Sequence, residues 1–325
     1  MWTSKMFSPS RRYLNWIVKR GRTVTGGLAL TTVFVGFIAV LALFNDDRNA
    51  YQLPNTPYFS NGYEWWWHSF VARSRADGSL RPLFIEYFVI NPGLGQSDVV
   101  PGGGGRRPSY AKLMAGTWGE HKAVLEALFP VSAFTASREI MDVHLGSNWA
   151  TDTELHGEIN GRADDTGPPQ HMAWNLRAEK VLHYDVGFLG GRLFQWRGAF
   201  DMQWHVRGMR TRYAGTVTWN DTVYDVEPDS SYGYQDKNWG RDYTEPWYWL
   251  SCNDFVSKIT GRVVPLTSLD GGGGTPRIYG WAVGKDKLLI ALRYQGALWE
   301  WNFTHLLNLP EQSLVVREEN DRGFR

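Results

Sequence analysis

Alternating hydrophobic and polar residues mark most of the chain after residue 57 as short strands. Segments rich in β-branched and aromatic residues recur there, bounded by Gly, Asn, Asp or Pro. They lie at 83–90, 212–217, 222–226, 278–283 and 288–294. Only 122–129 and 134–142 suggest helices, and both are short. The pattern predicts an all-β protein, and the number and spacing of strands favour barrels or sandwiches over propellers.

The start of the chain has a different pattern. Residues 1–22 hold six bases and no acid, and an uncharged apolar run follows at 24–44. A helix of about 20 residues is long enough to cross a bilayer. Bases precede the run and Asp46 and Asp47 follow it, which places the N-terminus in the cytoplasm. We expect a basic cytoplasmic arm at 1–22 and a single transmembrane anchor at 23–44, with the β-rich body on the non-cytoplasmic side.

A cleaved signal peptide and a buried core helix are the alternatives for this run. Signal peptides usually have an apolar part of roughly 7 to 15 residues, and no clean small-x-small cleavage site follows here. A core helix would usually show a polar face, which this run lacks. After the anchor we expect a linker at 45–57 and two β-barrel halves at 58–190 and 191–325.

Composition limits the kind of partner. The chain has 325 residues, of which 43% are hydrophobic and 15% aromatic, including 17 Trp, so it can bury a core and line a pocket for an apolar ligand. Without the first 22 residues it has 28 bases against 33 acids, which argues against nucleic-acid binding. Cys252 is the only cysteine, so no internal disulfide forms. The glycine runs 102–105 and 271–274 lack the Gly-Lys-Ser/Thr ending of a phosphate-binding loop, and we expect flexible loops there.

Two groups of polar residues precede the main candidate site in the sequence and could also take part in catalysis. In 62–68, strand alternation sends Glu64, Trp66 and His68 to one face, so an acid and an imidazole are close enough to tune each other's pKa. That pair either faces a cavity or is an exposed charge pair. In 202–205, we expect Trp204 to line a binding site and His205 to be a hydrogen-bonded structural histidine.

The richest stretch is 234–240, with its continuation to residue 255. If Asp236 and Asn238 project to one face of a strand, Lys237 and Trp239 project to the other. A carboxylic acid among apolar walls has a raised pKa and can donate a proton at neutral pH, and indole faces stabilise developing positive charge. The alternative is a turn in which Asp236 pairs with Lys237 or Arg241.

These residues resemble a known family. The stretch 234–240, followed by 247–255, is similar to the Glu-Lys-Asn-Trp-Gly and Trp-x-Trp-x-x-x-Asn-x-Phe signature of tocopherol cyclases. The Glu64-x-Trp66-Trp67 segment and the 271–274 glycine run also have counterparts there, so the resemblance covers roughly residues 55–305. More distantly the pattern resembles the carotenoid hydratase and lipocalin-like cyclase group. That resemblance implies two tandem lipocalin-like β-barrels.

The resemblance implies an isomerase that closes a prenylated hydroquinone, or a related isoprenoid, to a chromanol. The alkene is protonated and the phenol oxygen captures the tertiary cation, without a cofactor or a metal. By position Asp236 replaces the family's glutamate as the acid and is one methylene shorter, and Gln235 is a further departure. The implied partners are an isoprenoid or prenylquinone ligand and the membrane that supplies it. A non-catalytic carrier of a prenyl lipid and a hydratase of an isoprenoid alkene are the alternatives.

Pattern and resemblance together define the expected site. We expect Asp236 and Glu64 to face each other as two acids in one apolar barrel. The residues expected to be catalytic are Asp236, Glu64, Lys237 and Asn238. The residues expected to bind substrate are Trp66, Trp67, His68, Trp204, Trp239, Trp247, Trp249 and Asn253.

Overall fold

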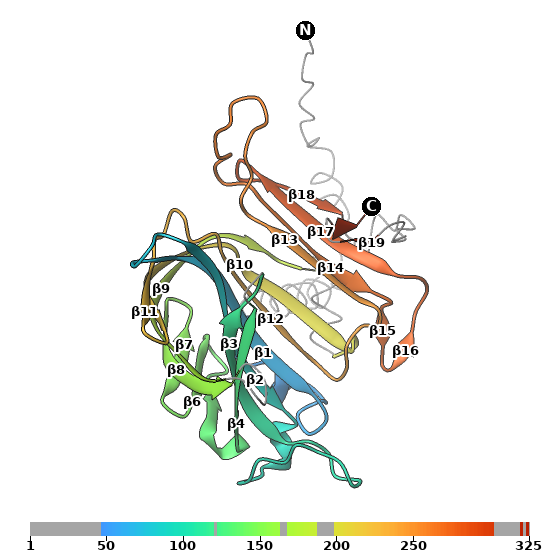
Figure 1. Cartoon of the computed structure of the whole chain (residues 1–325). Coiled ribbons are helices and arrows are strands. Elements are labelled where there is room, and N and C mark those ends of the chain that lie inside the picture. The colour runs from blue at the N-terminus through green and yellow to red at the C-terminus, as the bar shows by residue number, and fades with distance from the viewer. Residues whose placement is uncertain are drawn as a thin grey trace, which may run out of the picture. The chain divides into compact units, whose positions relative to one another are not determined.

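The computed structural model describes residues 47–119, 122–162, 168–186 and 198–301, and the backbone of a short strand pair near the C-terminus. The expected arm and anchor at 1–44 lie outside the described residues. In the part of the chain that is described, no helix is long and apolar enough to cross a membrane. The protein is all-β, as expected (Figure 1). Among the described residues the helical turns are three 3₁₀ turns: η1 (Leu53–Asn55), η2 (Pro92–Leu94) and η3 (Val131–Ala133).

A twelve-stranded antiparallel sheet makes up most of the fold. Its strand order is β4-β3-β2-β1-β11-β10-β9-β8-β7-β6-β5, and β12 also pairs with both β1 and β10. In chain order the strands are β1 (Tyr63–Ser74), β2 (Leu80–Ile90), β3 (Tyr110–Thr117), β4 (Ala123–Phe129), β5 (Phe134–Ala136), β6 (Asp142–Leu145), β7 (Asn148–Thr151), β8 (Glu154–Arg162), β9 (Pro169–Tyr184), β10 (Met202–Trp219), β11 (Thr222–Val226) and β12 (Gly233–Gly240).

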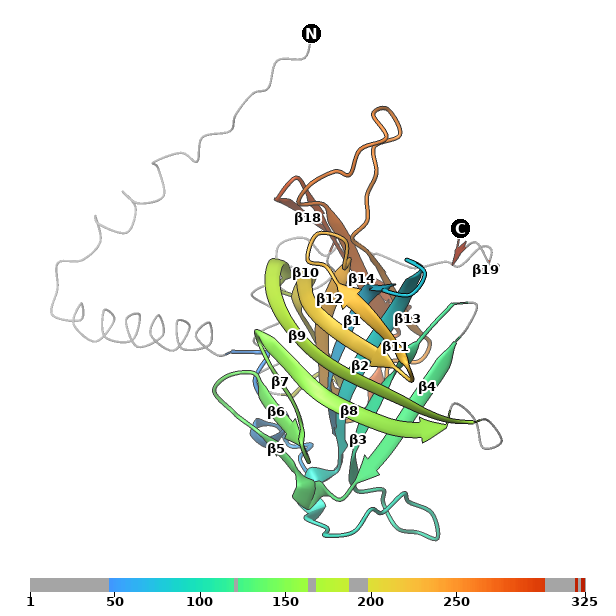
Figure 2. The same cartoon turned by 60° about the vertical axis from the view of Figure 1, so that its left-hand side comes forward.

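This sheet curls into a barrel-like wall around one apolar core (Figure 2). Inward positions follow the two-residue period of a strand: on β2, Leu83, Ile85 and Val89 are fully buried and belong to the core. The wall brings β4 against β8, since a Cβ placed on Gly161 would lie 3.6 Å from the Cβ of Leu125.

A second, four-stranded sheet packs on the outside of this wall. Its order is β13-β14-β17-β18, and its contact with the wall includes Trp204, Tyr234 and Ala291 in one buried cluster. The strands are β13 (Trp247–Cys252), β14 (Ser268–Gly274), β17 (Lys287–Tyr294) and β18 (Ala297–Trp301). Two short strand pairs complete the described elements: β15 (Arg277–Ile278) with β16 (Trp281–Ala282), and β19 (Glu319–Asn320) with β20 (Gly323–Phe324).

The boundary expected at residue 190 does not separate the two sheets. Strands β10, β11 and β12 follow that boundary in sequence but hydrogen-bond with β1 or β9 in the first sheet. Strand β12 lies between β1 and β10 and pairs with both, so it covers two strand edges that would otherwise be unpaired. The barrel-like wall therefore needs residues from both expected halves.

Two short helices expected from the sequence are absent from the described residues. The segment 122–129 forms β4, where Leu125 is buried while Val124 and Leu128 are exposed, which is the alternation of a strand. The segment 134–142 contains only the short strand β5 before it reaches β6. The segment 278–283, expected as one strand, contains the end of β15, a turn at 279–280 and the short strand β16, which pairs back on β15.

The glycine run 271–274 is a strand, β14, and not the flexible loop expected from its composition. Close approach of neighbouring chains explains the glycines. A Cβ on Gly272 would lie 3.1 Å from the indole of Trp204, and one on Gly273 would lie 2.0 Å from the carbonyl oxygen of Lys287. Glycine in a strand often marks such an approach.

We therefore expect Gly273→Ala to destabilise the protein by about 1 to 3 kcal/mol, because the β14–β17 pairing must shift to admit the methyl group. Urea unfolding of the purified protein measures this. Gly161→Ala is the matched control, since its methyl group would meet Leu125 at an ordinary 3.6 Å. Equal stability of the two variants would contradict the packing explanation.

Candidate active site

Strand β12 carries four of the residues expected to form the site, Asp236 to Trp239, and all eight residues of the strand are buried. Its two edges are hydrogen-bonded to β1 and β10, so its side chains can only project to the two faces of the sheet. Lys237 projects into the barrel-like wall, where it meets Glu64. Asp236 and Asn238 project outward into a pocket beneath the four-stranded sheet. The expected alternation along this strand is confirmed.

The pocket lies between β10, β12 and β14 and has a volume of about 100 Å³. Its walls are mostly apolar, and Trp247 at its edge is 50% exposed, so the pocket is open to solvent on that side. Among the residues that line it are Asp236, Asn238, Trp204, Trp247, Trp249, Met202, Gly272, Arg277, Lys287 and Leu289. Glycine at 272 leaves room for the indole of Trp204.

Asp236 is the buried acid of this pocket. Its Oδ2 accepts hydrogen bonds from the indole Nε1 of Trp204 at 2.9 Å and from the hydroxyl of Tyr234 at 3.1 Å. Burial raises the pKa of Asp236 to about 7, and these two hydrogen bonds oppose the rise. At neutral pH a substantial fraction of Asp236 therefore carries a proton that it can donate.

Other expected pocket residues take different positions. Asn238 donates from Nδ2 to the carbonyl oxygen of Gln203 at 3.0 Å, and Trp249 packs against Tyr234 with ring centroids 5.5 Å apart. Asn253 lies outside the pocket and donates to the carbonyl oxygen of Gly233 at 2.8 Å, which fixes the start of β12. Trp67 shares the outward face with Asp236 but stacks on Phe84 at 4.7 Å.

Glu64 does not face Asp236, contrary to expectation. It lies on the inward face, where its Oε1 is 2.5 Å from the Nζ of Lys237, and neither side chain is exposed. The ammonium of Lys237 also lies 5.0 Å from the ring centroid of Trp66 and 4.8 Å from that of Trp239. Burial raises the pKa of Glu64 and lowers that of Lys237, and their contact opposes both shifts. This ion pair and its two indoles lie outside the pocket that holds Asp236.

The ion pair holds a segment that was expected to be a linker. Residues 48–53 are buried inside the wall. The backbone N–H groups of Gln52 and Leu53 donate to the Glu64 carboxylate at 2.9 and 2.6 Å. Lys237 donates to the carbonyl oxygens of Arg48, at 3.2 Å, and Ala50. Buried backbone groups need hydrogen-bond partners, and here Glu64 and Lys237 supply them. These two side chains therefore have a structural role.

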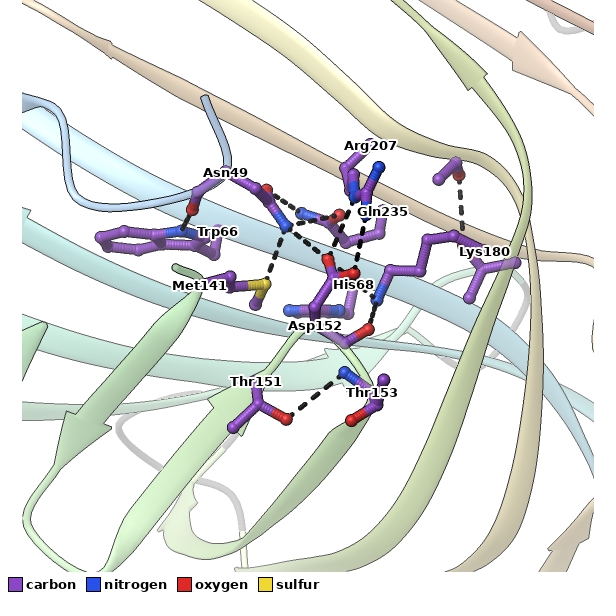
Figure 3. A network of polar contacts seen from close by, with 12 residues as sticks. Asn49, Trp66, His68, Met141, Thr151, Asp152, Thr153, Lys180, Arg207 and Gln235 are labelled. Carbon is purple, nitrogen blue, oxygen red and sulfur yellow. Dashed lines mark hydrogen bonds and ion pairs between the residues drawn. The ribbon is translucent and has the colours of Figure 1, made fainter. Parts of the chain in front are cut away.

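His68 and Gln235 belong to a polar network inside the same wall (Figure 3). Gln235 donates from Nε2 to Oδ1 of Asn49 at 3.1 Å, and Asn49 donates to Oδ1 of Asp152 at 3.0 Å. The Nδ1 of His68 lies 2.9 Å from the hydroxyl of Tyr213. Burial, and then the charge of Lys180, hold the pKa of His68 well below its usual value. His68 is therefore neutral and does not tune Glu64.

The structure thus divides the predicted site. It brings Asp236, Asn238, Trp204, Trp247 and Trp249 together around one pocket. It places Glu64, Lys237, Trp66, His68 and Trp239 on the opposite face of the sheet, and Trp67 and Asn253 beside the pocket rather than in it.

Three titratable residues near this face were not predicted. The hydroxyl of Tyr234 donates a hydrogen bond to Asp236, and Asp270 on β14 is fully buried. Glu86 on β2 lies opposite Trp67 in the strand pairing, and burial raises its pKa to about 7, against the opposing charge of Lys112. Glu86 does not line the pocket. The inward-outward alternation of 83–90 could have placed Glu86 on this face, but no sequence pattern marked Asp270.

Within the described residues, no group of His, Cys, Asp or Glu side chains has the arrangement needed to hold a metal ion. The chemistry that the pocket offers is proton donation by Asp236 next to indole faces.

Comparison with known proteins relates the chain to one family. The sequence model described as tocopherol cyclase-like matches residues 107–306. A probable chloroplastic tocopherol cyclase from Oryza sativa subsp. japonica is 28% identical over 146 residues, which are 44% of this chain and 30% of that protein. A chloroplastic tocopherol cyclase from Zea mays is 28% identical over 146 residues, which are 44% of this chain and 29% of that protein. The matched part thus spans less than a third of these relatives.

Among solved structures, the chain is similar to one assigned to AttH from Nitrosomonas europaea. The TM-score is 0.43 at 12% sequence identity, with 78% of this chain and 72% of that chain covered.

Proposed function

The chain belongs to the tocopherol cyclase-like family, and from that membership we propose that it is an isomerase that cyclises a prenylated hydroquinone or a related isoprenoid. The observation that carries the proposal is the carboxyl of Asp236, buried in the wall of an apolar pocket with a pKa raised to about 7. A proton donor of this kind suits protonation of an alkene, which needs an acid but no cofactor.

The proposed reaction moves one proton in and one proton out. Asp236 gives its proton to one alkene carbon, and the other carbon becomes a tertiary cation. The phenol oxygen of the same substrate attacks that carbon, forming the C–O bond of a chromanol. The proton then leaves the phenol oxygen for the Asp236 carboxylate. Substrate and product have the same composition, so the acid is regenerated without a co-reactant.

Neighbouring side chains support these steps. The indoles of Trp204, Trp247 and Trp249 line the pocket and offer π faces to the cation. One N–H of the Asn238 amide donates to the carbonyl oxygen of Gln203, and the amide oxygen can accept a hydrogen bond from the phenol. The mostly apolar walls offer a water molecule few hydrogen-bond partners, which favours closure over hydration.

Incubation of the purified full chain with a series of prenylated hydroquinones tests the proposal. We expect a chromanol of unchanged mass, detected by chromatography and mass spectrometry. A product heavier by one water would identify a hydratase instead. Co-purification of an unreacted prenyl lipid, with no product from any substrate, would identify a carrier and exclude the cyclase.

We also propose that the body meets this substrate at a membrane. The support is the apolar run at 24–44 and its basic flank, together with exposed Trp247 at the edge of the pocket. In the proposed orientation the β-rich body lies on the non-cytoplasmic side of the membrane. Protease added outside intact cells should therefore remove the body, and protection of the body would overturn this orientation.

A further inference from the structure

The pocket that holds Asp236 also has a basic side, to which the proposed reaction assigns no role. Among the described residues that line the pocket, three side chains can carry a charge: Asp236, Arg277 on β15 and Lys287 on β17. The two bases outnumber the acid even when Asp236 is ionised. Neither base lowers the pKa of Asp236, which burial raises and two hydrogen bonds oppose. The proton donor and the cations therefore occupy different parts of the pocket.

Arg277 is held in place by the protein itself. Its backbone carbonyl oxygen accepts the N–H of Asp201 at 3.0 Å. Its Nε donates to Oδ2 of Asp201 at 3.3 Å, and its Nη2 donates to the carbonyl oxygen of Gly280 at 3.2 Å. The buried Asp201 carboxylate is fixed in turn, because its Oδ1 accepts the backbone N–H of Gly280 at 3.0 Å. A guanidinium that is already positioned loses little conformational freedom when it binds a ligand.

The charge of Arg277 is only partly neutralised. The Asp201 carboxylate is shared with Arg241, whose Nη2 lies closer to Oδ2, at 2.9 Å. Asp242 is 3.9 Å from Nη2 of Arg277, beyond hydrogen-bond distance, and its side chain is 56% exposed, so solvent screens it. Two guanidiniums thus share one close carboxylate. Within the described residues no hydrogen bond uses Nη1 of Arg277, so its two N–H groups remain for a ligand.

Lys287 adds a second positive charge on this side of the pocket. It is the first residue of β17, and its neighbour in the sequence, Asp286, accepts a hydrogen bond from the hydroxyl of Thr275. A positive potential on one wall of an otherwise mostly apolar pocket favours a ligand that is apolar with one anionic group.

A carboxylate is the anion that fits this arrangement. The planar guanidinium matches the geometry of a carboxylate, and hydrogen bonds between the two groups are strengthened by their charges. A diphosphate carries several negative charges, and some of them would stay unpaired among the apolar walls, which is costly.

We propose that Arg277 is a specificity residue for a substrate whose phenol ring carries a carboxylate, with Lys287 adding to the attraction. The inference rests on the proposed function for the prenyl chain and the phenol, and it narrows the substrate class to prenylated phenolic acids. The carboxylate lies at Arg277 and the alkene lies at Asp236.

Equilibrium binding to the purified full chain, followed by quenching of tryptophan fluorescence, tests this without turnover. The probes are para-hydroxybenzoate with a farnesyl chain ortho to its phenol oxygen, the methyl ester of that acid, and farnesyl diphosphate. We expect the acid to bind about 10- to 100-fold more tightly than its ester, because the ester cannot form charge-assisted hydrogen bonds. Arg277→Met should remove most of this preference and leave binding of the ester nearly unchanged.

Arg293→Met is the matched control. Arg293 lies on β17 but does not line the pocket, and its guanidinium donates to the carbonyl oxygens of His183 and Gly296. This variant should keep the preference for the acid. If Arg277→Met does not fold, Arg277→Gln gives the same comparison, because glutamine keeps a donor for Asp201.

Equal affinity of the wild-type protein for acid and ester would overturn the proposal, as would a preference that survives the loss of Arg277. Tighter binding of farnesyl diphosphate than of the acid would overturn the assignment of a carboxylate. A preference for the acid without any cyclised product would contradict only the proposed function. Cyclisation of neutral prenylated hydroquinones, with no preference for the acid, would contradict only the role of Arg277.

Discussion

Replacing Asp236 with asparagine is expected to lower turnover of a prenylated hydroquinone by about 10²- to 10⁴-fold, the usual contribution of a general acid. Binding should be retained, because the amide fills the same space and can still accept the hydrogen bonds from Trp204 and Tyr234. Product formation and equilibrium binding, each measured on the purified protein, separate the two effects. Loss of binding and turnover together would contradict a role in proton donation.

Glu86→Gln is the matched control for this variant. Glu86 is also a buried carboxyl with a pKa raised to about 7, on the same face of the sheet, but it does not line the pocket. We expect it to leave turnover unchanged. Asp236→Glu, which installs the residue usual in the family, should retain part of the activity.

The assignment of Asp236 as the proton donor also predicts how turnover depends on pH. Burial raises the pKa of Asp236 to about 7, and the proposed mechanism requires the protonated form. Turnover should therefore be high below pH 7 and fall about tenfold per pH unit above it. A rate that rises through pH 7 would show that the ionised carboxylate acts instead, as a base.

Replacing Lys237 with methionine is expected to lower the free energy of unfolding by about 3 to 5 kcal/mol, the usual cost of leaving a buried charge without its partner. The change strands the Glu64 carboxylate and removes the donor to the carbonyl oxygens of Arg48 and Ala50. Urea unfolding followed by tryptophan fluorescence measures the effect. The double variant Glu64→Gln with Lys237→Met should lose less stability than the sum of the losses in the two single variants, since the two side chains form one interaction.

Arg75→Met provides the comparison for an exposed ion pair. Arg75 lies 2.6 Å from Asp225, and both side chains are largely exposed. Its loss should leave the free energy of unfolding almost unchanged, because the pair is screened by solvent. If Lys237→Met were as mild as this control, the inward ion pair would not be what holds residues 48–53 in the core.

Strand alternation was a sufficient guide to part of the site. It placed Asp236 and Asn238 on one face of β12 and Lys237 on the other, because a strand leaves its side chains only two directions. The all-β class followed from the same local pattern. The family signature then singled out residues of β12 and β13, of which the structure brings Asp236, Asn238, Trp247 and Trp249 together around the pocket.

The pairing between distant strands could not be predicted from these patterns. Glu64 and Asp236 each lie on a correctly identified strand, but only the pairing of Trp66 with Lys237 shows that they occupy opposite faces. Similarly, Asp270 stands before a glycine run that suggests a loop, and the close approach of Lys287 that requires those glycines lies on another strand. Such facts depend on partners far away in the sequence.

The burial of residues 48–53 has a consequence for synthesis of the protein on the ribosome. Lys237 hydrogen-bonds Ala50 and Arg48 across 187 and 189 positions of the chain, so these contacts cannot form until residue 237 has left the ribosome. Until then Glu64 lacks its cation and β1 lacks β12 as a neighbour. Contacts of such long range make folding slow. A nascent chain that stops at residue 190 should therefore be a substrate for chaperones rather than a folded domain.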